Sequence, residues 1–213
     1  MVAISGLTAL QGLRDHGQVR PGQQALIIGA SGGVGTFSVQ QAKAFGAIVT
    51  AVCSTAKVDL VRSLGADHVV DYIRDDFASD ERHYDLIVDI GGNASLSRLG
   101  RALTPNGTLV ITGGETGGRW IGGYDRQLRA AVLSRFVSQR LTSFISRENH
   151  EDMIVLAGLI ESGKITPVID RTYPLIEAPT PSGTWSRDAP EARSSSRSDD
   201  EPLMCVRSGQ TRW

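Results

Sequence analysis

A glycine-rich turn near the N-terminus is the part of this sequence with the clearest chemistry. It is Gly29-Ala30-Ser31-Gly32-Gly33-Val34-Gly35, between an apolar run at residues 24–28 and a run with helical apolar spacing at residues 34–46. These flanks predict a buried strand before the turn and a helix after it. Glycine permits tight backbone angles and the close approach of a ligand, and a helix start presents free N–H groups and a positive dipole end. We therefore predict that the turn binds the pyrophosphate of a dinucleotide.

The residues after the next expected strand, 47–52, bear on which nucleotide binds. NAD-binding turns are usually followed, about 20 residues on, by an Asp or Glu that binds the ribose 2′-hydroxyl. Here the sequence is Cys53-Ser54-Thr55-Ala56-Lys57, without an acid. Lys57 falls in the first turn of the expected helix, where a cation opposes the helix dipole. A bound 2′-phosphate would explain that position, with the Ser54 and Thr55 hydroxyls as further donors, so we predict NADPH. The alternative is a solvated lysine on a helix face.

Strands and helices alternate along the chain, which predicts an α/β fold with a doubly wound parallel sheet (Rossmann). Strands are expected at 24–28, 47–52, 66–72, 85–90, 108–112 and 141–145, helices at 5–16, 34–46, 56–64, 94–103, 126–140 and 151–160, and a turn at 105–107. Three of the strands end in glycine, at Gly29, Gly91 and Gly113. Ligands of such sheets bind at the carboxyl ends of the strands, so these glycines would let a flat cofactor lie there. Alternatively, they only turn the chain.

Composition narrows the functional class. With 213 residues, 40% apolar content and a net charge of −1, the chain fits an ordinary globular protein without the basic excess of a nucleic-acid binder. It has neither a signal peptide nor a run long enough to span a membrane. Cys53 and Cys205 cannot form a disulfide framework or a four-cysteine zinc site. We expect a cytoplasmic protein with no nucleic-acid or membrane partner.

Other nucleotide-binding classes fit less well. No Gly-Lys-Ser/Thr follows the turn, which excludes a P-loop, and no tyrosine is followed four residues later by the lysine of a short-chain dehydrogenase. A methyltransferase normally has an acid after the second strand. The four histidines are scattered along the chain, so we assign no catalytic residue and no metal site.

Together these stretches resemble the medium-chain dehydrogenase/reductase superfamily, and most closely its zinc-independent, quinone-reductase-like branch. The resemblance covers residues 3–179, in the family's order and spacing. Besides the glycine-rich turn, the matching motifs are Ser5-Gly6-Leu7-Thr8-Ala9, Ala42-Lys43-Ala44-Phe45-Gly46-Ala47, Leu64-Gly65-Ala66-Asp67, Val70-Asp71-Tyr72, Tyr84-Asp85-Leu86-Ile87-Val88-Asp89 and Gly163-Lys164-Ile165-Thr166-Pro167-Val168.

The resemblance implies roles for particular residues. Gly32, Gly33 and Val34 would contact the pyrophosphate. The 2′-phosphate end would be bound by Ser54, Lys57 and Tyr72, although Tyr72 fits a half-buried strand tyrosine equally well. The chain around Gly113 would contact the nicotinamide.

The resemblance also implies a missing part. Family members are similar to a two-domain protein, with a barrel-like catalytic domain ahead of the nucleotide domain, and we expect that domain to be absent here. Ile4-Ser5 stands where the zinc-dependent branch has a cysteine, which favours the metal-free branch. The expected organisation is a linking helix at 1–20, an NAD(P)-binding Rossmann domain at 21–165, a returning extended segment at 166–179 and a tail at 180–213.

The tail departs from the family after Pro179. If one G is restored before Thr180, permitted codons encode Asp-Ala-Ile-Arg-His-Leu-Glu. Carried on to Ser198, the same frame permits Ala-Arg-Gly-Lys-Val-Val-Ile-Thr-Val and then a stop, which is similar to the family's usual ending. We hypothesise that a one-base deletion replaced the native C-terminus from Thr180 onward, which the gene's codons would test. The alternative is a natural disordered tail, and under either hypothesis residues 180–213 are expected to pack poorly.

The predicted function is NADPH binding within an oxidoreductase that transfers hydride from NADPH to a small carbonyl, enone or quinone. Without the catalytic domain, the nicotinamide would be open to water, so we expect cofactor binding with little or no turnover by this chain alone. The alternative from another class is a non-enzymatic nucleotide-binding module or a degraded remnant. A homodimer through the edge of the fifth and sixth strands stays open.

Overall fold

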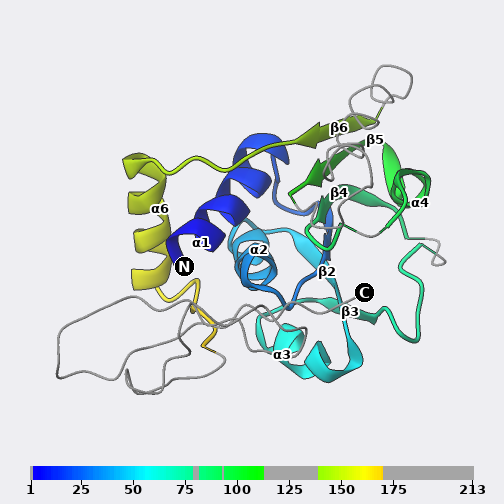
Figure 1. Ribbon diagram of the computed structural model, residues 1–213, viewed down its shortest axis with the longest axis horizontal. Helices are drawn as coiled ribbons and strands as arrows, with labels where there is room; N and C mark the ends of the chain where they lie inside the picture. Colours follow the sequence, from blue (N-terminus) through cyan, green and yellow to red (C-terminus); the bar gives the residue numbers. More distant parts are fainter. Residues whose placement is uncertain (1, 79–81, 93, 113–138, 170–213) are drawn as a thin grey trace, which may run out of the picture.

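A parallel β-sheet forms the centre of the protein (Figure 1). The structure is a computed structural model that describes residues 2–78, 82–92, 94–112 and 139–169. Within these residues the sheet has six strands: β1 Gln24–Ile28, β2 Ile48–Cys53, β3 His68–Asp71, β4 Tyr84–Asp89, β5 Leu103–Ile111 and β6 Arg140–Ser143. Their order is β3-β2-β1-β4-β5-β6, and neighbouring strands are parallel throughout. The predicted doubly wound parallel sheet is therefore confirmed.

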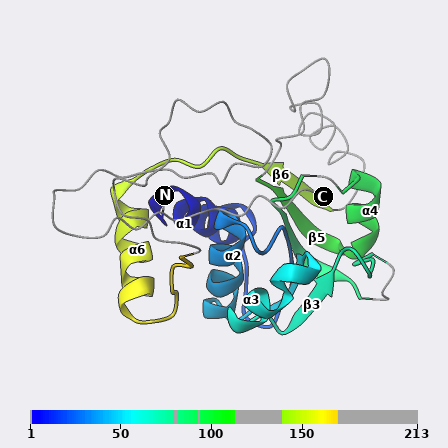
Figure 2. The same cartoon turned by 60° about the horizontal axis from the view of Figure 1, so that its bottom comes forward.

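Helices cover both faces of this sheet. They are α1 Val2–Gln11, α2 Gly33–Ala44, α3 Val58–Ser63, α4 Leu96–Ala102 and α6 His150–Glu161, with a π-helical turn η1 at Gly12–His16 and a 3₁₀ turn η2 at Thr55–Lys57. In Figure 2, α4 lies on the opposite side of the sheet from α2 and α3. None of the helices in the described part of the chain is long and apolar enough to cross a membrane.

The core has two layers, one on each face of the sheet, and a third, smaller cluster where α1, α2 and α6 meet. Ala25 and Ile27 of β1 pack with residues of α2 and α3, whereas Leu26 and Ile28 pack with residues of α4. Each fully buried leucine or isoleucine contributes about 1.5–3 kcal/mol to folding. Burial on both faces explains why β1 is a continuous apolar run rather than an alternating one.

Buried amide side chains attach the two ends of the described chain to this core. Gln41 of α2 donates to the carbonyl of Gly6 in α1 (3.0 Å). Gln40 donates to the carbonyl of Thr166 (3.1 Å) and accepts from its N–H group (2.7 Å), as a neighbouring strand would. The predicted linking helix and returning segment are thus held by side chains of α2, while the predicted domain boundaries stay predictions.

One predicted element is wrong. The turn expected at residues 105–107 lies inside β5, at a register shift where Tyr84 pairs with Leu103 but Leu86 pairs with Thr108. Between these two pairs β5 has four residues and β4 has one, and such an irregularity tolerates the missing N–H group of proline. Glycine is favoured at position 107, because a Cβ there would lie 3.0 Å from the carbonyl oxygen of Tyr84, a tight contact.

The remaining predicted elements agree in kind, with shifted ends. The first helix begins at Val2 and continues into η1. The strand expected at 66–72 is shorter, His68–Asp71. The expected helix at 126–140 falls outside the described residues except for its last two positions, and Arg140 begins β6. The predictions for the tail, 180–213, lie wholly outside them.

An ionic cluster around the buried carboxylate of Asp152 joins the start of α6 to α1 and η1. The carboxylate of Asp152 accepts hydrogen bonds from Gln11 (2.8 Å) and Asn149 (2.7 Å) and lies 2.6 Å from the guanidinium of Arg14. Burial alone would raise the pKa of Asp152, but these three partners lower it below its ordinary value. The cluster therefore stabilises the fold only while Asp152 is ionised.

Replacing this carboxylate should cost stability in a pH-dependent way. We expect Asp152→Asn to lower the free energy of unfolding by about 1–3 kcal/mol at pH 7. Because folding lowers the pKa of Asp152, its contribution is complete above about pH 4, the ordinary value for aspartate, and is lost as the pH falls through the folded-state pKa. Urea unfolding at pH 7 and pH 3 measures this. Asp59, whose side chain is 99% exposed, is the control, and an equal loss in Asp59→Asn would contradict the prediction.

Candidate functional site

The glycine-rich turn lies where the strand order reverses, between β1 and β4. Gly29 follows β1 with a φ of +85°, in the left-handed region that favours glycine. A Cβ on Gly29 would lie 3.1 Å from the backbone nitrogen of Gly91, which follows β4. The N–H groups of Ile90 and Gly91 both donate to the carbonyl of Ile28 (3.0 and 3.3 Å). The structure thus brings together Gly29 and Gly91, two of the predicted site residues, at the carboxyl ends of neighbouring strands.

The first turn of α2 packs directly on the backbone that precedes it. A Cβ on Gly35 would lie 2.1 Å from the carbonyl oxygen of Gly29 and 2.7 Å from the Cα atom of Ala30. Only glycine fits at such a distance. Gly35 was not among the individual residues predicted to bind the cofactor, although the third glycine of the pattern was the signal for this close helix packing.

The start of α2 has no side chain of its own to cap it. The N-cap residue is Gly32, in an extended conformation (φ −79°, ψ 175°), and the first N–H groups of a helix have no partner within it. Gly32, Gly33 and Val34 are all partly exposed. Ser31 is only 6% exposed, and its hydroxyl has no hydrogen-bond partner among the described residues. A buried hydroxyl left unpaired is costly, so the turn provides unused donors of the kind that an anion would satisfy.

A second corner of the candidate site lies beyond β2. Ser54 is buried directly after that strand, and Lys57 is partly exposed at the N-terminal cap of α3, one position before the helix rather than within its first turn. Tyr72 is half-buried directly after β3. Burial raises the pKa of the Tyr72 phenol, a hydrogen bond with the Ser54 side chain opposes that rise, and the Asp71 charge adds to it. The three residues predicted for the 2′-phosphate end thus come from two segments that meet at one edge of the sheet.

The structure also brings an acid to this corner, which the sequence pattern missed. Asp71 pairs with Cys53 in the register of β3 and β2. Its carboxylate accepts hydrogen bonds from the Thr55 hydroxyl (2.5 Å) and the Ile73 N–H group (3.0 Å). The bond from Thr55 is the main reason that the pKa of Asp71 lies below its ordinary value, although burial opposes it. No acidic residue directly follows β2 in the sequence. Asp71, at the end of β3, nevertheless contacts the loop that follows β2.

Several other candidates have structural roles or lie elsewhere. Gly113 falls outside the described residues. Asp89 is fully buried and accepts the N–H group of Gly92 (3.0 Å), which agrees with an acid that satisfies backbone donors. Burial and the Asp71 charge raise the pKa of the Cys53 thiol to about 11, so this thiol is a poor nucleophile at neutral pH. Among the described residues, no group of three or more His, Cys, Asp and Glu side chains could hold a metal ion.

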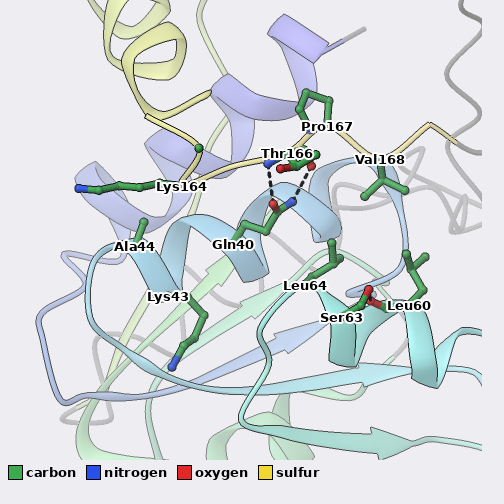
Figure 3. Close-up of a pocket in the computed structure, with 11 residues that line it drawn as sticks. Gln40, Lys43, Ala44, Leu60, Ser63, Leu64, Lys164, Thr166, Pro167 and Val168 are labelled. Carbon is green, nitrogen blue, oxygen red and sulfur yellow. Dashed lines mark hydrogen bonds between the residues drawn. The ribbon is translucent and has the colours of Figure 1, made fainter. Parts of the chain in front are cut away.

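A cavity of about 660 Å³ lies apart from the glycine-rich turn (Figure 3). It is lined by the C-terminal half of α2, by α3 and by the segment after α6. Figure 3 shows Gln40 bonded to Thr166 at its edge. Lys43 forms an ion pair with Asp67 (2.8 Å). These two polar side chains are thus used within the protein, and the cavity is a weaker candidate for the nucleotide than the turn.

The strand order β3-β2-β1-β4-β5-β6, with a glycine-rich turn and a helix start at the reversal, defines a doubly wound domain of the dinucleotide-binding class. A family model described as zinc-binding dehydrogenase matches residues 64–180. The mitochondrial NAD(P)H oxidoreductase RTN4IP1 of Mus musculus is 36% identical over 195 residues, covering 84% of this chain and 48% of the relative. The chloroplast envelope quinone oxidoreductase homolog of Arabidopsis thaliana is 31% identical over 185 residues, covering 82% and 54%.

Solved structures of oxidoreductases also match the fold of this chain. The quinone oxidoreductase from Coxiella burnetii matches with a TM-score of 0.65 and 26% identity, covering 81% of this chain and 51% of that one. The chain therefore belongs to the zinc-binding dehydrogenase family of the medium-chain dehydrogenase/reductase superfamily, in its quinone-reductase-like branch. Its relatives are oxidoreductases, and it spans about half the length of the curated relatives it matches. Independence from zinc stays a prediction.

The contact beneath Gly35 can be tested with a matched pair of glycines. Because its added methyl group would meet backbone atoms, we expect Gly35→Ala to lower the free energy of unfolding by about 1–3 kcal/mol and to abolish nucleotide binding. Gly158 of α6 has no atom within 4 Å of an added Cβ, so Gly158→Ala should be neutral or stabilising by up to about 1 kcal/mol. Thermal unfolding of both variants measures the difference. Wild-type stability in Gly35→Ala would show that the turn is less tightly packed than described.

Proposed function

We propose that this chain is the NADPH-binding part of an oxidoreductase that transfers hydride from NADPH to a small carbonyl, enone or quinone. The observation that carries the proposal is the start of α2 at the strand-order reversal, which has a glycine as its N-cap. Beside it lies the buried hydroxyl of Ser31, which has no partner within the described part of the chain. Relatives named as an NAD(P)H oxidoreductase and a quinone oxidoreductase homolog support a redox role.

The pyrophosphate would bind at the first turn of α2. The N–H groups of Gly33 and Val34 would donate to its oxygens, and the helix dipole would add to the attraction. Gly32 would contact it without donating, because its N–H group already bonds the Gly29 carbonyl (3.2 Å). The hydroxyl of Ser31 would gain the partner that it lacks among the described residues. Gly29, Gly35 and Gly91 contribute no donor side chain; they let the backbone approach closely.

The preference for NADPH over NADH rests on the corner beyond β2. Ser54, Lys57 and Tyr72 would bind the 2′-phosphate, Lys57 through its charge and the other two through hydroxyl groups. NADH-specific sites use a carboxylate to accept the ribose 2′-hydroxyl. The acid present here is Asp71, whose two carboxylate oxygens already accept hydrogen bonds from Thr55 and Ile73. This arrangement supports NADPH.

The other end of the site would hold the nicotinamide and the substrate. When bound, NADPH supplies the hydride, and the protein's task is to hold the nicotinamide against a shielded acceptor. The segment around Gly113 would contact the nicotinamide, and no catalytic residue is assigned. Since the chain spans about half the length of its curated relatives, we propose that it binds the cofactor with little turnover by itself. Pairing of two copies along β6 and a cytoplasmic location stay predictions.

The alternative function is a non-enzymatic nucleotide-binding module or a remnant of an enzyme, and an NADPH oxidation assay can refute it. We expect turnover close to background when the purified chain is assayed with a panel of quinones, enones and small carbonyls. Appreciable turnover would refute both that expectation and the non-enzymatic alternative, and it would show that the chain holds a complete active site.

The proposed cofactor preference is tested at Lys57. If Lys57 binds the 2′-phosphate, Lys57→Ala should lose about 1.5–3 kcal/mol of the preference for NADPH over NADH, the value of a charged hydrogen bond. Fluorescence titration of the chain with each cofactor measures the ratio. Lys164, exposed at the edge of the cavity, is the control, and Lys164→Ala should keep the wild-type ratio. Equal affinity of the unmutated protein for both cofactors would contradict the proposal.

A further inference from the structure

The loops that follow β2 and β3 leave the sheet side by side. The two strands are parallel neighbours, with Cys53 opposite Asp71 at their carboxyl ends. The N–H group of Tyr72 donates to the carbonyl of Cys53 (3.1 Å), which extends the pairing one residue further. Figures 1 and 2 show β3 beside α3, the helix to which the β2 loop leads. A side chain on one loop can therefore hold the other.

Asp71 is the side chain that joins the two loops. It is 8% exposed, and its carboxylate oxygen Oδ2 accepts the Thr55 hydroxyl at 2.5 Å. The other oxygen, Oδ1, accepts the N–H group of Ile73 at 3.0 Å. The Asp71 main-chain carbonyl also accepts N–H groups from Arg74 and Asp75 (3.0 and 2.8 Å). Hydrogen bonds to a charged acceptor are stronger than neutral ones, so the carboxylate fixes both its own loop and Thr55.

We propose that Asp71 and Thr55 are positioning residues that set the cofactor preference of the site. This inference rests on the proposed function. The bond from Thr55 holds the turn that carries Ser54 and Lys57 against the loop that carries Tyr72, so the predicted 2′-phosphate ligands stay in one arrangement.

The same bond keeps the Asp71 carboxylate from acting on the nucleotide. While Thr55 occupies Oδ2, that oxygen is used within the protein, and the guanidinium of Arg74, 3.7 Å away, partly offsets its charge. If the Thr55 hydroxyl is removed, Oδ2 loses this donor and can accept one from a nucleotide at the corner where the adenosine ribose would lie. An available carboxylate repels a 2′-phosphate and accepts a hydrogen bond from a 2′-hydroxyl. Removing one hydroxyl should therefore weaken NADPH binding and strengthen NADH binding.

Substitutions of Thr55 test this inference. Thr55 is exposed, so Thr55→Val removes the hydroxyl without creating a cavity in the core. We expect the ratio of NADPH to NADH affinity to fall by about tenfold, as for the loss of a hydrogen bond to a charged group. Thr55→Ser keeps the hydroxyl and should restore the ratio. Ser63→Ala is the control, because it removes a hydroxyl of α3 that bonds only to the Leu60 carbonyl among the described residues.

The readout is the affinity ratio, measured by titrating each full-length variant with NADPH and NADH. A merely structural role would weaken the binding of NADPH and NADH alike. An unchanged affinity ratio in Thr55→Val would therefore overturn the inference while leaving the proposed function intact. The inference would also be overturned if Thr55→Ser lowered the ratio as much as Thr55→Val. Equal binding of NADPH and NADH by the unmutated chain would overturn the proposed function, and this inference with it.

Discussion

The direct backbone contact between Gly35 and the Gly29–Ala30 segment is the constraint on which the candidate site depends. It leaves no room for a side chain at position 35, so α2 starts immediately above the end of β1. That position aims the first turn of α2 at the reversal in strand order, and it leaves Gly32 to cap the helix with no side chain. A larger residue would lift the helix away and separate its N–H groups from the crevice. The close backbone packing at Gly35 is therefore also a requirement for nucleotide binding at the start of α2.

The rest of the fold holds this contact in place. Apolar residues bury both faces of the sheet, while amide side chains of Gln40 and Gln41 attach the two ends of the described chain to α2. The Asp152 cluster does the same between α6 and η1. At the far edge, Asp71 and Thr55 join the β2 and β3 loops. Each of these contacts is made by a buried or half-buried polar group that has a partner. Such contacts fix one specific arrangement of the elements, rather than only holding them close together.

The predictable parts of this structure were those with local signals. β1 was predicted at 24–28, its observed bounds, because an apolar run stands between two turn signals. The glycine pattern predicted the turn and the helix after it. The irregular part of β5 at 105–107 was predicted as a turn because proline, asparagine and glycine suit both. The Thr55–Asp71 bond was missed because the two residues are 16 positions apart and meet only through the register of β2 and β3. The Thr55–Asp71 contact is determined by how β2 pairs with β3, which the residue types alone do not indicate.

An amide NMR titration of the chain with NADPH tests the central claim most directly, because it reports where the cofactor binds. If the pyrophosphate binds at the start of α2, the amide signals of Ser31 to Val34 should shift and saturate together, along with those of Ser54 and Tyr72. Signals around the cavity lined by Lys43 and Lys164 should stay in place. Shifts confined to that cavity, or no saturable shift at the turn, would contradict the account.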